Sequence, residues 1–327
     1  MNPMNEDQAR AHKQEIVDRF GPWLSYNLHL VGDVYTIAPG RVGLGERNIA
    51  RILQLVSDNA RKPLDQLRIL DLGAHEGGYA IELARHGAEV VAVEARDAHV
   101  AKGRFAKECL GLENLEIIHD DVRNLSVDRN GTFDVVLCLG ILYHLDAPDI
   151  VPFLNAVSAA SADLTLLETQ MSLRGTDSIH SGGRTYSGRY FPEDTSQPGA
   201  AIEGNKAFWL TRSSLLNLLA DVGFTSVAQS LSPLVLKTAP LMDHATFLAR
   251  KGTVQQMLSL SEWERPSVQR WPERMRRLAE PSQSMLRTVR DRVAQLTGRG
   301  FYQRLYGKED ATRRSETRGE GTGTPAK

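Results

Sequence analysis

The sequence predicts an α/β fold with a doubly wound, mostly parallel sheet of seven strands. Short apolar runs have the length of buried strands, and segments with apolar residues at helical spacing alternate with them. The expected strands are 69–72, 89–94, 115–118, 133–139, 164–168, a short run at 227, and 245–249. The expected helices that alternate with them include 47–56, 150–157 and 215–222. Such alternation is typical of a parallel sheet that is covered on both faces.

The region before this pattern, residues 1–44, is predicted to be an N-terminal extension. We expect frayed chain over 1–10, a short helix that ends at Gly21, and a hairpin within 23–37. The aromatic residues of this region either line a substrate mouth or cap the core, and the sequence leaves both interpretations open. They are Trp23, Tyr26, His29 and Tyr35.

The stretch after the first strand combines an acidic residue with glycines. Asp71 lies within the run 69–72, and Gly73, Gly77 and Gly78 follow it. Glycine lets the backbone approach a ligand without a Cβ in the way, and the N-terminus of the following helix favours polar ligand groups. This order predicts a site for a nucleotide-like ligand, although ordinary tight turns also contain such glycines.

The next three strands end in residues suited to the same ligand. Glu94 ends the second strand, 23 positions after Asp71 (94 − 71), where a carboxylate can accept hydrogen bonds from both ribose hydroxyls. Asp121 follows the third strand, where a carboxylate can accept from an adenine amino group. The fourth strand ends at 140–144. The four strand ends therefore predict one crevice at the carboxyl edge of the sheet.

Together these residues, with the strand 133–136, resemble the class I S-adenosylmethionine-dependent methyltransferases. We assign this domain to residues 45–252, and the resemblance implies that its final strand is antiparallel. A dinucleotide dehydrogenase is the nearest rival, but residues 74–76 break its G-x-G-x-x-G loop.

The resemblance implies S-adenosylmethionine as the cofactor. It implies that Asp71 and Gly73 lie near the methionine moiety, Glu94 near the ribose and Asp121 near the adenine. Neighbouring residues complete the expected cofactor site: Ala74, Gly77, Ala95, Val122 and Leu139.

Methyl transfer is an in-line displacement, so the protein must chiefly orient the acceptor and exclude water. A base is needed only when the acceptor must lose a proton. His144, beside Tyr143 at the tip of the fourth strand, is the candidate, because histidine exchanges protons near neutral pH. A structural role for this histidine is the alternative. The sequence shows no metal cluster, and no Asn/Asp-Pro-Pro-Tyr/Phe motif of the enzymes that methylate amino groups of DNA bases.

A long segment, residues 171–208, separates the fifth strand from the helix at Thr211 and is rich in Gly, Ser, Arg and Tyr. We interpret it as a loop that forms a substrate lid, with a solvated loop as the alternative. Arginines with interleaved tyrosines suit a phosphate, a carboxylate or a stacked ring. The candidate substrate-binding residues are Arg184, Tyr186, Arg189 and Tyr190.

Beyond this domain, residues 253–308 predict a basic helical extension and 309–327 a disordered tail. The basic helices could contact a membrane surface, RNA or a partner, or form a solvated face. The whole chain is balanced, with 39 basic and 40 acidic residues, so nucleic acid is not favoured. Its two cysteines fit core positions. We expect a cytoplasmic protein without a transmembrane segment, and the sequence leaves the oligomeric state open.

Three further motifs, 140–144, 166–169 and 205–210, are similar to the tRNA wobble-uridine carboxymethyltransferase group. In that group the tyrosine matched by Tyr143 helps to hold the carboxylate of a modified cofactor. The N-terminal part differs from that group, and a carboxylate-binding arginine segment is missing. The sequence therefore predicts methyl transfer to an O or N atom of a small-molecule, sugar or lipid-linked acceptor. The alternatives are a tRNA wobble-uridine enzyme and an inactive cofactor-binding accessory protein.

Overall fold

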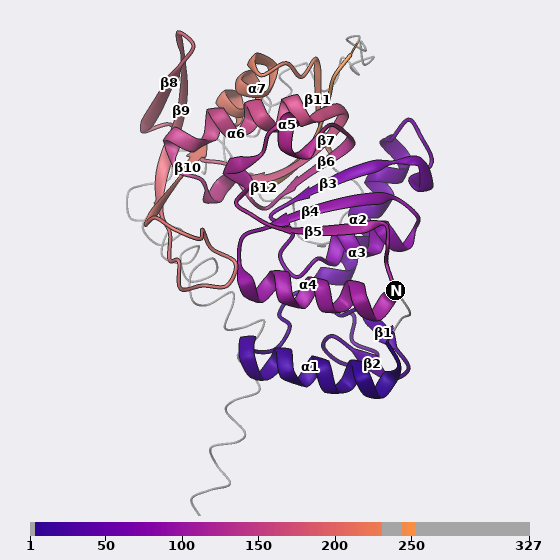
Figure 1. Ribbon diagram of the computed structural model, residues 1–327. Helices are drawn as coiled ribbons and strands as arrows, with labels where there is room; N and C mark the ends of the chain where they lie inside the picture. The colour runs from indigo at the N-terminus through magenta and orange to yellow at the C-terminus, as the bar shows by residue number, and fades with distance from the viewer. Residues whose placement is uncertain (1–3, 231–243, 253–327) are drawn as a thin grey trace, which may run out of the picture. The chain divides into compact units, whose positions relative to one another are not determined.

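The computed structural model describes residues 4–230 and 244–252. Its main feature is a seven-stranded sheet with the order β11-β12-β7-β6-β3-β4-β5 (Figure 1). The strands are β3 (Arg68–Leu72), β4 (Glu89–Glu94), β5 (Leu115–His119), β6 (Phe133–Leu139), β7 (Ser161–Gln170), β11 (Ser226–Ser230) and β12 (His244–Arg250). Strands β3 to β7 are parallel, and β12 runs antiparallel to both β7 and β11. The predicted doubly wound sheet and its antiparallel last strand are confirmed.

Helices cover both faces of this sheet (Figure 1). One face packs against α2 (Leu44–Asn59), α3 (Gly78–Arg85) and α4 (Asp97–Leu110), and the other against α6 (Ala147–Ala160) and α7 (Arg212–Asp221). Successive residues of β3 point into different cores, because side chains alternate along a strand: Ile69 joins the first and Leu70 the second. Cys109 and Cys138 are buried and free, as expected.

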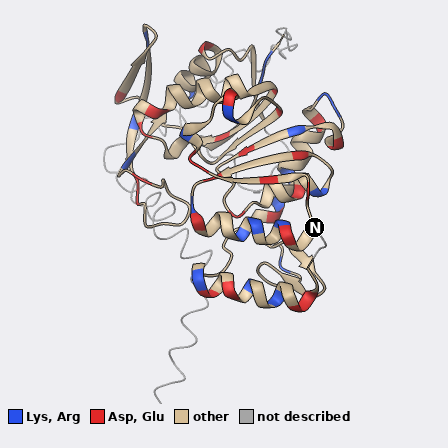
Figure 2. Ribbon diagram, viewed as in Figure 1, with Lys and Arg blue, Asp and Glu red and all other residues tan. Residues whose placement is uncertain are grey.

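The N-terminal extension begins with α1 (Glu6–Phe20), whose N-cap Asn5 accepts a hydrogen bond from the backbone N–H of Gln8. The predicted fraying over residues 1–10 is therefore wrong for 6–10, because a capping box satisfies the first turn. The predicted hairpin is present as β1 (His29–Val31) and β2 (Val34–Tyr35). Basic and acidic residues are interspersed along α1 and α4 (Figure 2).

The segment predicted as a loop, 171–208, instead contains most of a second sheet. Strands β8 (Asp177–Ser181), β9 (Arg184–Pro192) and β10 (Lys206–Leu210) form it, in the antiparallel order β10-β9-β8 (Figure 1). Its polar composition was misleading because one face of this sheet is solvated, while Tyr186, Phe208 and Leu210 are buried. Residues 193–205 connect β9 to β10.

The ends of the helices carry residues suited to them. Gly111 follows α4 with φ +62°, and Thr211 is the N-cap of α7. Helix α4 begins at Asp97, and Arg96 occupies its N-cap position. The predicted extension 253–308 and tail 309–327 lie outside the described residues. In the described part of the chain, no helix combines the length and the apolar character needed to cross a membrane.

Candidate active site

The glycine loop presents a buried acidic residue at the end of β3. Asp71 is 1% exposed, and its Oδ2 atom has no hydrogen-bond partner among the described residues. Burial, followed by the nearby Glu94 carboxylate, raises the pKa of Asp71 to about 7. Gly73 and Gly77 have φ angles of +68° and +83°, a backbone region that favours glycine. A cationic ligand group beside Asp71 would complete its hydrogen bonding and favour its ionised form.

Glu94, at the end of β4, organises the same loop. Its carboxylate accepts hydrogen bonds from the backbone N–H groups of His75 and Arg96, each at 2.8 Å. Burial alone would raise its pKa, but the hydrogen bonds from His99 and the backbone outweigh burial and hold the pKa below its usual value. Glu94 therefore fixes the loop between β3 and α3, and its predicted ribose contact stays a prediction.

Asp121 lies after β5 and caps a short helical turn, η2 (Val122–Asn124). Its carboxylate accepts from the backbone N–H of Arg123 at 2.8 Å and from the guanidinium of the same residue. Burial would raise the pKa of Asp121, but Arg123 lowers it below its usual value. An adenine amino group would therefore share this carboxylate with Arg123, and that contact also stays a prediction.

The other predicted cofactor residues lie at the same edge of the sheet. Ala74 belongs to the glycine loop, Ala95 follows β4, Val122 follows β5, and Leu139 ends β6. The Ala95 carbonyl is 3.0 Å from Nε2 of His119. The structure thus brings together the carboxyl ends of four neighbouring parallel strands, the place where open α/β sheets bind ligands.

A buried ion pair between the glycine loop and α4 was not identified from the sequence. Glu76 and Lys102 are 0% and 2% exposed, and Lys102 Nζ lies 3.1 Å from Glu76 Oε1. The Glu76 carboxylate also accepts from the backbone N–H groups of Leu24 and Ser25. Lys102 donates to the Pro22 carbonyl at 2.7 Å. The signal in the sequence was an acidic residue inside the glycine loop and a lysine in the middle of an otherwise well-packed helix.

This ion pair fastens the N-terminal extension over the loop. A Cβ on Gly78 would lie 2.4 Å from the Tyr26 ring, so glycine is required for this close contact. The Tyr26 ring also meets Tyr79 edge-on, with centroids 5.5 Å apart. Four aromatic residues of the extension were expected either to line a substrate mouth or to cap the core, and of these Tyr26 lies at the loop. Trp23 packs in the core, and His29 stacks on Tyr35.

The candidate base belongs to η3 (Leu142–His144), the turn after β6. His144 Nδ1 lies 3.1 Å from Oε1 of Glu193, and the other carboxylate oxygen accepts from the Ala201 backbone N–H at 3.2 Å. Both side chains are largely buried, with exposed fractions of 15% and 9%. The centroids of the Tyr143 ring and the His144 imidazole are 4.3 Å apart. Glu193, which the sequence did not single out, therefore orients the predicted base.

The segment 193–205 is also linked to the cofactor-binding edge. The guanidinium of Arg96, which follows Glu94, donates to the carbonyls of Ala200 and Ala201, both at 3.0 Å. One connection thus supplies the Glu193 carboxylate and contacts the end of β4.

The four predicted substrate-binding residues divide into two pairs. Tyr186 is buried and donates to Asp221 on α7 at 2.7 Å, and Arg184 pairs with the same carboxylate at 3.2 Å. Arg189 and Tyr190 are exposed. These contacts favour a structural role for the first pair, and substrate binding stays a prediction for all four.

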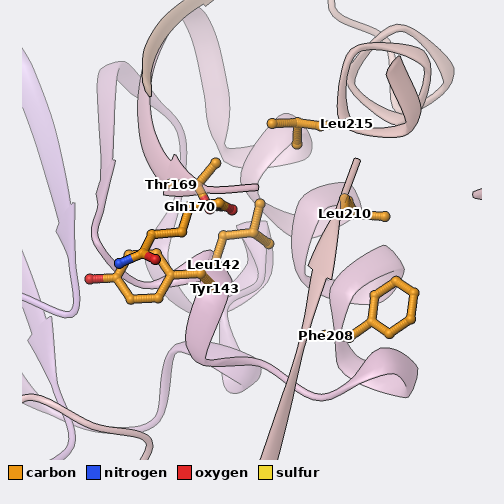
Figure 3. A pocket seen from close by; sticks show the side chains of 7 residues that line it. All are labelled: Leu142, Tyr143, Thr169, Gln170, Phe208, Leu210 and Leu215. Carbon is orange, nitrogen blue, oxygen red and sulfur yellow. Dashed lines mark hydrogen bonds between the residues drawn. The ribbon is translucent and has the colours of Figure 1, made fainter. Parts of the chain in front are cut away.

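A small pocket lies beside Tyr143 (Figure 3). Leu142, Tyr143, Thr169, Gln170, Phe208, Leu210 and Leu215 line it. The gap does not admit a water molecule, so it is a packing defect between η3, β7 and β10 rather than an acceptor site. Among the described residues, no group of three or more His, Cys, Asp or Glu side chains is arranged to hold a metal ion.

Comparisons with known proteins agree with this geometry. Residues 69–162 match the protein family described as Methyltransferase domain. Ubiquinone biosynthesis O-methyltransferase of Acinetobacter baumannii (strain AYE) is 31% identical over 81 residues, which cover 25% of this chain and 34% of that protein. The enzyme of the same name from Maricaulis maris (strain MCS10) is 32% identical over 90 residues, 28% of this chain and 35% of that protein. The matched region thus spans about a third of the length of these relatives.

Among solved structures, the N-terminal domain of EvdMO1, crystallised in the presence of SAH and D-fucose, has a TM-score of 0.58 and 24% identity. The match covers 77% of this chain and 98% of that one, and shows a shared fold. The chain therefore carries a class I S-adenosylmethionine-dependent methyltransferase domain. The cofactor of this domain is S-adenosylmethionine, and the unpartnered Asp71 oxygen fits its cationic methionine moiety. The resemblance to the tRNA wobble-uridine group stays a prediction.

Proposed function

We propose that the protein transfers the methyl group of S-adenosylmethionine to a hydroxyl oxygen of a small ring-containing acceptor. The observation that carries this proposal is the His144–Glu193 pair at the end of β6. A hydroxyl group must lose its proton as it gains the methyl group, so an oriented base favours this acceptor class. The names of the relatives, O-methyltransferases of ubiquinone biosynthesis, and the D-fucose beside EvdMO1 support a phenolic or sugar hydroxyl.

In this mechanism Glu193 accepts a hydrogen bond from Nδ1–H of His144, which leaves Nε2 as the atom that takes the acceptor proton. Bound S-adenosylmethionine supplies an electrophilic methyl group. Asp71 holds the charged methionine end, and Glu94 keeps the loop in position. Tyr26 and the segment 193–205 exclude water from the cofactor. The buried free cysteines are consistent with the cytoplasmic location that we include in this proposal.

The test compares wild type with His144→Gln and Glu193→Gln, using labelled S-adenosylmethionine and a panel of phenols and sugars. We expect methyl transfer to fall by about 10²–10⁴-fold in His144→Gln, the usual contribution of a general base. Binding of S-adenosylhomocysteine should be unchanged in both variants. Full turnover by His144→Gln would contradict the proposal.

A further inference from the structure

Strand β9, which leads into Glu193, carries two exposed or half-buried functional groups on one face. Side chains alternate along β9, so Arg189 and Phe191 lie on one face, and that face continues to Glu193 just beyond the strand. Trp209 of β10 pairs directly with Arg189 and shares this face. The base-orienting carboxylate and these groups thus form one row.

The two rings of this row form a face-to-face stack, called here the aromatic platform. Phe191 and Trp209 stack with centroids 3.8 Å apart and ring planes 22° apart. Both are half-buried, so part of each ring reaches solvent. Trp209 Nε1 donates to the Tyr143 carbonyl at 2.8 Å, and the Tyr143 ring meets Trp209 edge-on at 6.1 Å. The platform is therefore continuous with the turn that bears the candidate base.

The platform ends in a positive charge, the guanidinium of Arg189. The Arg189 guanidinium lies 5.4 Å from the Phe191 ring centroid. Within 4–230 and 244–252, no acidic side chain forms an ion pair with Arg189, whereas Arg184 of the same strand pairs with Asp221. At a strand rise of about 3.4 Å per residue, the backbone of Arg189 lies about 14 Å from that of Glu193. The guanidinium, however, lies beside Phe191, two residues nearer Glu193, which leaves about 7 Å along the strand. A ring with a hydroxyl at one end and an anionic group at the other can span that shorter distance.

We infer that Arg189, Phe191 and Trp209 form the acceptor subsite, which takes a hydroxyl-bearing ring that carries a phosphate or carboxylate group. The ring packs against the part of the aromatic platform that reaches solvent, because the inner faces of Phe191 and Trp209 cover each other. The anion pairs with the planar guanidinium of Arg189, and the hydroxyl is directed to His144. This inference rests on the proposed function, because it takes His144 as the base.

The test measures calorimetric binding to the full chain loaded with S-adenosylhomocysteine, with two pairs of probes. Glucose 1-phosphate is compared with methyl glucoside, and 3,4-dihydroxybenzoate with catechol, so each pair differs essentially by its anionic group. We expect at least one charged probe to bind ten times or more tightly than its neutral partner. Arg189→Gln should abolish this preference, and Phe191→Ala should weaken both members of the pair. Arg10→Gln, an exposed arginine on α1, is the control for the loss of one positive charge and should keep the preference.

The inference is overturned if neither charged probe binds more tightly than its partner, or if Arg189→Gln keeps the preference. Melting temperatures with S-adenosylhomocysteine verify that each variant is folded. Methyl transfer to the same probes separates the two hypotheses. Charge-dependent binding without transfer by any panel member would contradict the proposed function alone, whereas transfer with an unchanged KM in Arg189→Gln would contradict the acceptor subsite alone.

Discussion

Glu76 and Lys102 form an ion pair of 3.1 Å that is almost completely buried, and this pair joins three parts of the chain. Glu76 belongs to the glycine loop, Lys102 belongs to α4, and both bind the backbone of 22–25. Both carboxylate oxygens of Glu76 and the ammonium group of Lys102 thus have hydrogen-bond partners. This arrangement offsets the high cost of burying two charges, and it makes the cofactor loop depend on the N-terminal extension.

Removing one member of this pair should be strongly destabilising. We expect Lys102→Met to lower the free energy of unfolding by about 3–5 kcal/mol, because it leaves the Glu76 carboxylate buried without its charge partner. Chemical denaturation measures this change. The double variant Glu76→Gln/Lys102→Met should lose less free energy of unfolding than Lys102→Met alone, because it leaves no unpaired buried charge.

The matched control is the surface pair of Glu82 and Arg85, which lie 3.3 Å apart on α3. Glu82→Gln should cost no more than about 1 kcal/mol, since exposed ion pairs contribute little. Equal losses in Lys102→Met and Glu82→Gln would show that the buried pair does not hold the extension in place.

Asp71 should make the ligand-free protein less stable as the pH rises. Its pKa is raised to about 7 in the folded chain, against about 3.9 for an ordinary aspartate. The folded state therefore binds more protons than the unfolded state between about pH 4 and 7. Stability should fall through this window by at most about 1.4 kcal/mol per pH unit. Asp71→Asn should remove this component, and Asp65→Asn, an exposed control, should not.

The same carboxyl group should couple cofactor binding to proton release. A cationic ligand favours the ionised form of Asp71, so S-adenosylmethionine should release up to one proton on binding near pH 6. Calorimetry in buffers of different ionisation enthalpy measures this number. Proton release that persists in Asp71→Asn would assign it to another group.

The sequence predicted the elements of the main sheet well because their signals are local. Apolar runs such as 133–139 and stripes such as 47–56 report burial on the scale of one strand or one helix, and both elements were found. The cofactor residues followed, since parallel strands end at one edge of the sheet. The sequence therefore predicted where Asp71, Glu94 and Asp121 lie in the sheet, but it did not predict their hydrogen-bond partners.

The contacts that could not be predicted join residues far apart in the chain. Glu193 is separated from His144 by 49 positions, and Lys102 from Pro22 by 80. The sequence of strand β9 resembles a loop because its few buried residues alternate with polar ones. Only its pairing with both β8 and β10 explains this pattern. Polar partners of this kind depend on tertiary structure and leave no periodic signal.

Glu94 should contribute strongly to cofactor affinity. Glu94→Ala removes the expected ribose acceptor and releases the backbone N–H groups of His75 and Arg96. We expect the affinity for S-adenosylhomocysteine to fall at least about tenfold, which corresponds to about 1.4 kcal/mol. The control is Glu89→Ala at the other end of β4, where the side chain is 66% exposed. Unchanged affinity in a folded Glu94→Ala variant would remove Glu94 from the site.

Cofactor binding should order the connection 193–205 but leave the second sheet as it is. The backbone of β9 and β10 is paired along its length, so its amide protons should exchange slowly with and without ligand. Residues 193–205 contain no strand or helix and are held to the cofactor-binding edge through Arg96. A ligand at that edge should therefore slow amide exchange in 193–205 but leave amide exchange in β9 and β10 unchanged. Hydrogen exchange followed by mass spectrometry measures both regions in one experiment.

Arg96→Ala gives the connection a direct test. It removes the two hydrogen bonds to Ala200 and Ala201, and exchange in 193–205 should become fast in the ligand-free protein. Because Ala201 also donates to Glu193, the candidate base should lose its orientation, and methyl transfer should fall more than cofactor affinity. Slow exchange over 193–205 in both the ligand-free and the ligand-bound wild type would identify the connection as a fixed part of the fold. The lid predicted from the sequence would then be wrong, while the His144–Glu193 pair would remain preformed.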